Sequence, residues 1–130
     1  MDDRVVFHGF VSPGLLREKV KLLNPILVMP SRSEGRMPYV AHTKIYEYLS
    51  YGLPIVASDL PSVREVFSGN DAVVLVNPGS PNDLAEGIRW VLQNPIEARK
   101  FGILAKELAR KYSWKERAKS LSKVFKTVTC

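Results

Sequence analysis

The chain has 130 residues, of which 45% are apolar and 25% charged, and its formal net charge is +6. These values are typical of a globular domain, or part of one, that buries a modest core. They exclude a membrane-spanning helix, because the longest apolar runs have four or five residues and a crossing needs about 20.

The expected location of the protein is the cytoplasm. The chain starts with Met1, Asp2 and Asp3, whereas a secretion signal starts with basic residues and a long apolar run. Cys130 is the single cysteine, so no internal disulfide is possible.

The positive charge favours anionic partners such as nucleotides, nucleic acid or an anionic membrane face. An ordinary solvated basic surface accounts for the charge equally well. Since the lysines and arginines are spread along the chain, we expect no nucleic-acid partner. A peripheral membrane contact stays open.

The first predicted strand is Arg4–His8, a short apolar segment. Ser12 and Pro13 then have the types typical of a helix cap and first helical position. The helix that follows has one apolar face, made of Leu16, Val20 and Leu23.

Ile26–Met29 is predicted as the second strand, and its continuous apolar character suits a parallel sheet buried on both faces. Residues 30–42 are rich in proline, glycine and polar side chains, which indicates a loop. A helix is predicted over Thr43–Tyr51, and Gly52 stands where a helix-ending glycine belongs.

Two more strands are predicted, at Pro54–Ser58 and Ala72–Val76. The last third of the chain predicts three helices, because it has three polar cap sequences, at Ser80, Asn94 and Ser113. The last helix has an apolar stripe made of Trp114, Ala118, Leu121, Phe125 and Val128.

Strands and helices alternate, so the fold class is α/β with a mostly parallel sheet. We see no repeat and no linker in the sequence, so residues 1–130 are expected to form a single unit.

The loop 30–42 and the helix behind it are the best candidate site, since ligands of parallel sheets bind beyond the carboxyl ends of strands. The backbone N–H groups at Thr43 suit a phosphate, and Lys44 adds a positive charge. Glu47 can accept hydrogen bonds from ribose hydroxyls, and Glu34 from those of a sugar.

Each of these residues also has a structural explanation. A carboxylate near a helix start, such as Glu47, stabilises the helix dipole without any ligand. Glu34 with Gly35 fits an ordinary turn, and Lys44 fits a solvated surface. His42 alone makes no metal site, and the sequence shows no other metal-ligand cluster.

Several segments taken in order go further than these local patterns. They are 6–11 (VFHGFV), 29–31 (MPS) with Glu34-Gly35, 44–48 (KIYEY), 52–61 (GLPIVASDLP), 64–66 (REV) and 112–114 (YSW). The series resembles the C-terminal, donor-binding domain of the retaining GT-B glycosyltransferases of family 4, also called group 1. The resemblance covers nearly the whole chain and implies a Rossmann-like parallel sheet.

The resemblance implies a donor site for a nucleoside diphosphate sugar, a UDP- or GDP-sugar, without a resident cofactor or metal. By this resemblance, the base lies beside the backbone at Phe10 and Val11, and Glu47 binds the ribose. The diphosphate lies at Thr43 and Lys44, and the transferred hexose lies at Glu34 and Gly35. Many family members have two glutamates eight positions apart. Here His42, not a glutamate, stands eight positions after Glu34. The family's role in contacting the sugar, including a catalytic role, is therefore carried over to Glu34 less well than the ribose role is carried over to Glu47.

The family domain begins with two further strand–helix units, after an N-terminal acceptor domain, and the sequence shows no counterpart of either. We therefore expect a partial domain. The family's strand order is 3-2-1-4-5-6, so losing strands 1 and 2 removes the neighbour of Ile26–Met29. Either Arg4–His8 pairs there directly or another chain fills the space. The apolar stripe of the last helix likewise favours a homodimer.

The leading hypothesis is hexosyl transfer with retention, as in polysaccharide biosynthesis, in which this chain supplies part of the donor site and is inactive alone. The missing acceptor domain, or a partner chain, would complete the enzyme. One alternative is a non-catalytic module, derived from such an enzyme, that binds a nucleoside diphosphate or a protein. A second is an epimerase acting on a nucleotide sugar.

Overall fold

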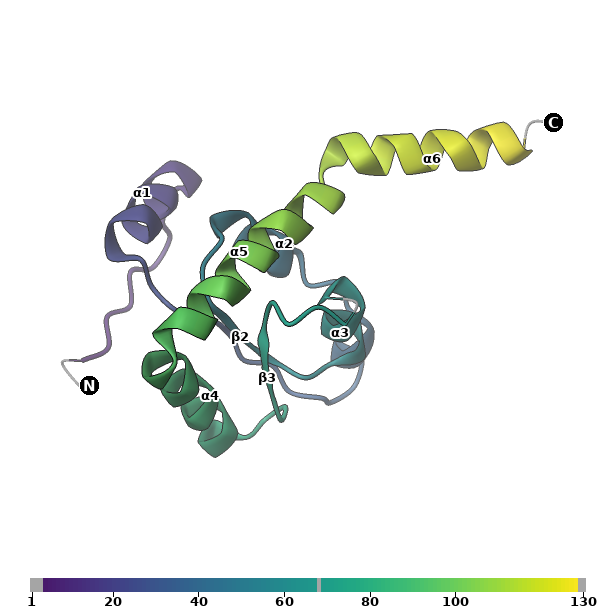
Figure 1. The fold of residues 1–130 in the computed structure, drawn as a ribbon. Helices are drawn as coiled ribbons and strands as arrows, with labels where there is room; N and C mark the ends of the chain where they lie inside the picture. The colour runs from purple at the N-terminus through teal and green to yellow at the C-terminus, as the bar shows by residue number, and fades with distance from the viewer. Residues whose placement is uncertain (1–3, 68, 129–130) are drawn as a thin grey trace.

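The computed structural model describes residues 4–67 and 69–128. Within them the chain forms three strands, six α-helices and one 3-10 helix (Figure 1). In chain order these are α1 (Pro13–Leu23), β1 (Leu27–Met29), η1 (Met37–Tyr39), α2 (Thr43–Tyr51), β2 (Ile55–Ser58), α3 (Pro61–Phe67), β3 (Val74–Val76), α4 (Pro81–Gln93), α5 (Pro95–Lys111) and α6 (Trp114–Val128).

The three strands form one parallel sheet in the order β1-β2-β3. Val28 pairs with Val56, and Ala57 with Leu75. Every residue of the central strand β2 is buried, as is typical of a strand of a parallel sheet that is covered on both faces. The α/β fold with a parallel sheet is therefore confirmed.

Helices cover both faces of the sheet. On one face, Ile55 and Ala57 pack in a cluster with buried side chains of α2, α3 and α5. On the other face, Val56 and Val76 pack against Val91 of α4. Alternate side chains of β2 thus enter two separate cores, which is the period of two that a strand imposes.

The predicted strand Arg4–His8 is wrong. Residues 5–9 have no regular secondary structure, and Val5, Val6 and Phe7 are exposed. A strand is stabilised by hydrogen bonds to a neighbour, and this segment has no neighbouring strand in the sheet. The expectation that Arg4–His8 pairs directly with β1 is wrong for the same reason. The alternative, that another chain lies beside the outer edge of β1, stays a prediction.

The outer edge of β1 is partly covered from α2. Leu27 donates its N–H to the carbonyl of Pro54 at 2.9 Å, so Leu27 bonds toward β2 and the polar groups of Val28 point to the outer edge. There the hydroxyl of Tyr48 donates to the Val28 carbonyl at 3.2 Å. This bond joins α2 to the strand that precedes the candidate site loop.

The predicted caps are largely confirmed. The hydroxyls of Ser12, Ser80 and Ser113 accept N–H groups three residues on, at 3.4, 3.2 and 3.3 Å. Asn94 precedes α5 but makes no side-chain cap. Gly52 ends α2 in the left-handed conformation, with φ of 68°. Helix α3 was not predicted from the sequence, because its seven residues are too few for a helical apolar pattern to stand out.

Two glycines bring α2 and α5 into close contact. A Cβ atom at Gly102 would lie 2.5 Å from the carbonyl oxygen of Gly52, and a Cβ at Gly52 would lie 3.0 Å from the side chain of Lys106. Gly102 is therefore needed because there is no room for a side chain at this position. Gly52 is needed both for room and for its positive φ, which residues with a Cβ rarely adopt. The contact fixes the position of α2 against the core.

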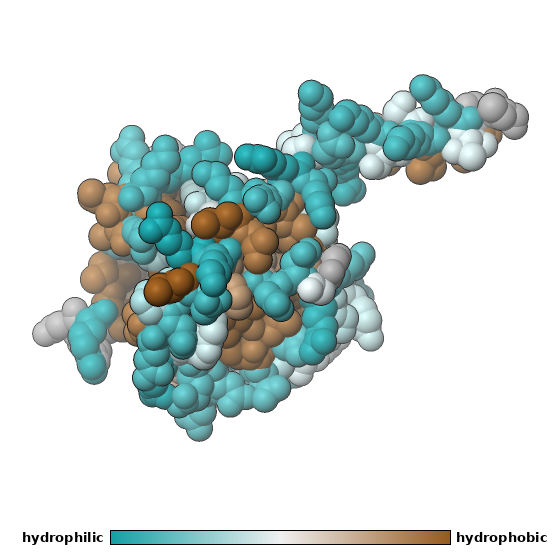
Figure 2. Space-filling view, viewed as in Figure 1, coloured by the Kyte–Doolittle hydropathy of each residue, from teal (hydrophilic) through white to brown (hydrophobic). Residues whose placement is uncertain are grey.

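The last helix, α6, projects away from the rest of the described chain (Figure 1). None of its side chains is buried. In the space-filling view its hydrophilic and hydrophobic side chains are both open to view (Figure 2). No helix in the described residues is long and apolar enough to cross a membrane.

The contact between α2 and α5 predicts a specific sensitivity to volume. Gly102→Ala should lower the free energy of unfolding by about 1–3 kcal/mol, the usual effect of overpacking, because the new methyl group meets backbone rather than a movable side chain. Gly14→Ala in α1 is the matched control, since its Cβ has nothing within 4 Å. Chemical denaturation measures both, and equal stability of the two variants would contradict the packing.

Candidate functional site

The candidate site lies between the carboxyl end of β1 and the start of α2. The connecting loop contains Glu34 and Gly35, followed by η1. The carbonyl of Glu34 accepts the N–H of Met37 at 3.3 Å, and Gly35 has φ of 60°. The two residues therefore form a turn that needs glycine, and the Glu34 side chain is exposed on it.

The start of α2 has the features of an anion site. His42 occupies the cap position, but its side chain makes no cap hydrogen bond, and the first turn has no acidic side chain. The exposed residues Thr43 and Lys44 follow. Their N–H groups lie at the positive end of the helix dipole, and Lys44 adds a full positive charge.

Glu47, one turn further into α2, has its carboxylate held in place. The hydroxyl of Tyr51 donates to Oε1 of Glu47 at 2.9 Å. Among the described residues, none donates a hydrogen bond to the other oxygen, Oε2. Arg17 of α1 is close enough to Tyr51 to lower its pKa, so a positive charge lies near this pair.

Two tyrosine hydroxyls beside Glu47 resist ionisation. Burial raises the pKa of Tyr51, and the hydrogen bond to Glu47 and its negative charge raise it further, against the opposing effect of Arg17. Burial also raises the pKa of Tyr48, with a second contribution from the charge of Glu47. Both hydroxyls therefore stay protonated as donors through the neutral range.

The other predicted contacts are less organised. Phe10 is 98% exposed, and Val11 is half-buried, in the irregular segment before α1. Thr43, Lys44 and Glu47 share one helix, so the structure brings these three together. It does not bring Phe10 into contact with a site wall, because almost its whole side chain is open to solvent.

A hollow at the carboxyl ends of the strands includes the first residues of the predicted site loop 30–42, but the part played by Ser58 and by the residues after β3 was not predicted. It has a volume of about 320 Å³, and its lining includes Ser31 and Arg32 after β1, Ser58 at the end of β2, and residues after β3. The Ser58 hydroxyl accepts the N–H of Ser31 at 2.8 Å and donates to its carbonyl at 3.0 Å. A serine directly at the end of a strand was the available signal. Glu34 and Glu47 do not line this hollow.

A second, smaller cavity of about 200 Å³ lies beside the start of α2. It is lined by residues at the end of η1, around the start of α2, in α3 and just after α5, among them His42 and Ser62. The atoms Nε2 of His42 and Oγ of Ser62 are buried without a hydrogen-bond partner among the described residues. Two such atoms in one cavity are normally satisfied by water or a ligand group.

The family comparison decides which kind of protein this is. The chain matches the model of the family "Glycosyl transferases group 1" over residues 1–94.

The chain belongs to the group 1 glycosyltransferases. The match contains β1, the site loop, α2, β2, α3 and β3, so it includes the whole candidate site. The resemblance found in the sequence is confirmed at the level of the family.

Two curated relatives are similar to this glycosyltransferase chain. The phosphatidyl-myo-inositol mannosyltransferase of Mycobacterium leprae is 30% identical over 84 residues, which cover 65% of this chain and 22% of the relative. An uncharacterized glycosyltransferase of Methanocaldococcus jannaschii is 29% identical over 103 residues, covering 79% of this chain and 28% of the relative. The chain thus spans about a quarter of the length of these relatives.

One solved structure has a similar fold. Sucrose-phosphate synthase from Thermosynechococcus elongatus superposes with a TM-score of 0.66 at 20% identity, over 86% of this chain and 28% of that chain. This likeness shows the fold alone, which is a Rossmann-like fragment of a GT-B protein. In the described residues, no three His, Cys, Asp or Glu side chains lie together as a metal site.

The tyrosine pKa values give a test of the Glu47 environment. Glu47→Gln should lower the pKa of Tyr51 and Tyr48 toward their ordinary value, because the carboxylate charge raises both. An NMR titration of ring-labelled tyrosines measures this, with the exposed Glu107→Gln on α5 as the control. Unchanged Tyr51 titration would contradict the hydrogen bond.

The same shifts predict how stability depends on pH. Because the folded-state pKa of Tyr51 and Tyr48 is raised, their contribution is complete below the ordinary tyrosine pKa. It is lost as the pH rises through the folded values. The alkaline loss of stability should be shallower in Glu47→Gln than in the parent chain.

Proposed function

We propose that this chain supplies part of the donor site of a retaining glycosyltransferase that transfers a hexosyl group from a UDP- or GDP-sugar. The observation that carries the proposal is the arrangement of α2. Its uncapped start follows the site loop, and a carboxylate held by Tyr51 stands one turn inside it. Family membership supports the glycosyl-transfer chemistry.

Glu47 is the proposed ribose ligand. A carboxylate oxygen can accept hydrogen bonds from vicinal hydroxyls. Oε1 of Glu47 accepts the Tyr51 hydroxyl, so Oε2 is the proposed acceptor for the ribose. Tyr51 acts as a positioning residue, since it restricts the rotamers of Glu47 before the ligand arrives.

The start of α2 is the proposed diphosphate site. The N–H groups of Thr43 and Lys44, together with the Lys44 ammonium, would stabilise the negative charge that grows on the leaving diphosphate. Glu34 and Gly35 would contact the transferred sugar, and the segment at Phe10 and Val11 the base. The nucleotide sugar is the substrate, and the proposal includes no resident cofactor.

The rest of the enzyme is part of the proposal. We place the acceptor site on an N-terminal acceptor domain or a partner chain, since this chain spans about a quarter of its relatives. The Mycobacterium leprae relative is named for phosphatidyl-myo-inositol, which supports a lipid-linked acceptor here.

A non-catalytic nucleotide-binding module is the second candidate. The exposed turn at Glu34 favours it, because no hydrogen bond from a described residue holds this carboxylate near a reacting atom. Nucleotide binding without glycoside formation, measured after an acceptor domain is added, would support this candidate over the transferase.

Calorimetric titration of the 130-residue chain with UDP and with GDP tests the donor site. Glu47→Gln should weaken binding of the preferred nucleotide about tenfold or more, because a hydrogen bond to a charged group contributes about 1.5–3 kcal/mol. Tyr51→Phe should give a smaller loss, since the carboxylate remains but is less restrained. Glu107→Gln is the matched control and should bind as the parent chain does.

Three results of the titration can be told apart. Saturable binding that depends on Glu47 supports the donor site, and the preferred base identifies the donor class. Binding that is equal in Glu47→Gln and the parent would contradict the role of Glu47. Failure of both nucleotides to bind would contradict a donor half-site that functions in this chain alone.

A further inference from the structure

The smaller cavity beside the start of α2 contains two polar atoms that the fold leaves unsatisfied. Nε2 of His42 and Oγ of Ser62 are both buried, and neither has a hydrogen-bond partner among the described residues. A buried polar atom without a partner costs free energy, so such atoms are rare in folded proteins. Two of them in the lining of one cavity indicate that a molecule with hydrogen-bonding groups occupies it.

An added protein domain is a poor candidate for this occupant. His42 directly precedes α2 and Ser62 lies in α3, so the walls of the cavity come from elements of this chain. Both unsatisfied atoms are buried within these walls. A domain that packs on the outer surface would leave them as they are. The occupant must therefore be small enough to enter the cavity.

The volume of the cavity suits a single sugar ring. It is about 200 Å³, whereas pockets for drug-sized ligands have about 300–1,000 Å³. A whole nucleotide is therefore too large. One water molecule has a share of about 30 Å³ in the liquid, so the cavity has room for a molecule much larger than water. A pyranose ring lies between these two limits.

Aromatic rings form much of the wall. Tyr46 and Tyr112 both line the cavity, and their ring centroids lie 5.1 Å apart. The Tyr112 hydroxyl donates to the Val66 carbonyl at 2.9 Å, which fixes this ring against α3. Tyr39 is 83% exposed and lies at the rim. Aromatic walls with a few placed polar groups are typical of a small-molecule site, and the C–H face of a sugar ring can pack on such walls.

The charges around the cavity favour a neutral ligand. Among the described residues that line it, Glu65 is the only Asp, Glu, Lys or Arg. Its carboxylate disfavours a second negative charge nearby, whereas the start of α2 and Lys44 disfavour a cation. A hydroxyl group is neutral and both donates and accepts. It can therefore pair with the Ser62 hydroxyl and with either tautomer of His42.

We propose that this cavity binds the hexose ring of the donor, as a neutral sugar, and that His42 and Ser62 form hydrogen bonds with its hydroxyls. The inference rests on the proposed donor site. His42 directly precedes Thr43, where the diphosphate is placed, so a hexose attached to that diphosphate lies next to the cavity. The sugar contacts proposed for the turn at Glu34 remain. His42 and Ser62 are thus specificity-determining residues for the donor.

Calorimetric titration with paired sugar nucleotides tests the proposed sugar class on the 130-residue chain. The pairs are UDP-glucose with UDP-glucuronic acid, and GDP-mannose with GDP-mannuronic acid. For the preferred base, the hexose conjugate should bind at least tenfold more tightly than the uronic acid conjugate, because Glu65 repels the added carboxylate. Equal binding of the two conjugates, or tighter binding of the uronic acid, would overturn the proposal.

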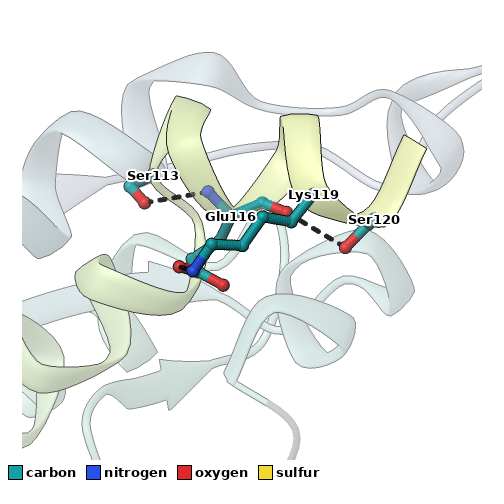
Figure 3. Close-up of polar contacts among 4 residues, drawn as sticks. All are labelled: Ser113, Glu116, Lys119 and Ser120. Carbon is teal, nitrogen blue, oxygen red and sulfur yellow. Dashed lines mark hydrogen bonds and ion pairs between the residues drawn. The ribbon is translucent and has the colours of Figure 1, made fainter. Parts of the chain in front are cut away.

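A pair of serine variants separates the cavity from the nucleotide site. Ser62→Ala should weaken binding of the hexose conjugate about threefold to tenfold and leave binding of the free nucleoside diphosphate unchanged, because only the sugar reaches this hydroxyl. The fold should tolerate the change, since the hydroxyl has no partner among the described residues. Ser120→Ala is the matched control. It removes a hydroxyl that donates to the Glu116 carbonyl at 3.1 Å within α6 (Figure 3) and should change neither affinity.

The serine variants also distinguish the two proposals. If Ser62→Ala binds the hexose conjugate as the parent chain does, the hexose assignment is overturned. Binding of the free diphosphate that depends on Glu47 would still support the donor site in that case. A loss of affinity in Ser62→Ala that is equal for the conjugate and the free diphosphate would also overturn the assignment, because the hydroxyl would then act on the whole site.

A measurement without nucleotide keeps the test decisive if no nucleotide binds the isolated chain. The chain has two histidines, so His8→Gln leaves His42 as the single imidazole seen by NMR. Free glucose, galactose or mannose at millimolar concentrations should then shift the His42 ring signals in a saturable way, with smaller shifts when Ser62→Ala is added. If no nucleotide binds and none of the three sugars shifts these signals, water alone fills the cavity and the proposal is overturned.

Discussion

The close approach of α5 to the end of α2 is the constraint on which the candidate site depends. The carbonyl oxygen of Gly52 lies 2.5 Å from where a Cβ on Gly102 would be, so the two helices meet at this point through backbone without an intervening side chain. This contact, with the buried side chains of Ile45 and Leu49 beneath it, sets how far α2 stands from the sheet. The start of α2 and Glu47 take their positions from that packing, and the Tyr48 bond to the edge of β1 fixes the helix from the other side.

Local chemistry explains what the sequence predicted well. The serine caps at Ser12, Ser80 and Ser113, and the left-handed Gly52, depend on residues within one turn. Their types alone therefore indicate where helices begin and end. The buried strand β2 was predictable for a similar reason, because the short run Ile55–Ala57 is continuously apolar, which favours a strand covered on both faces.

Features that depend on distant neighbours were not predictable in this way. The segment at Val5–Phe7 has the composition of a strand, yet it stays irregular and exposed because no strand of the sheet lies beside it. The hollow around Ser31 and Ser58 arises where the end of β2 meets the loops after β1 and β3. The i, i+4 spacing of Glu47 and Tyr51 was visible in the sequence. That the hydroxyl donates to this carboxylate, however, depends on how Tyr51 packs against the core and on the nearby Arg17 of α1.

The central claim is that a nucleoside diphosphate binds across the start of α2 with its ribose on Glu47. A crystal structure of the chain with the preferred nucleotide tests it most directly. We predict that both ribose hydroxyls, or one of them, lie within hydrogen-bond distance of the Glu47 carboxylate, with the diphosphate at the N–H groups of Thr43 and Lys44. A nucleotide bound instead in the hollow at Ser31 and Arg32, away from Glu47, would contradict the account.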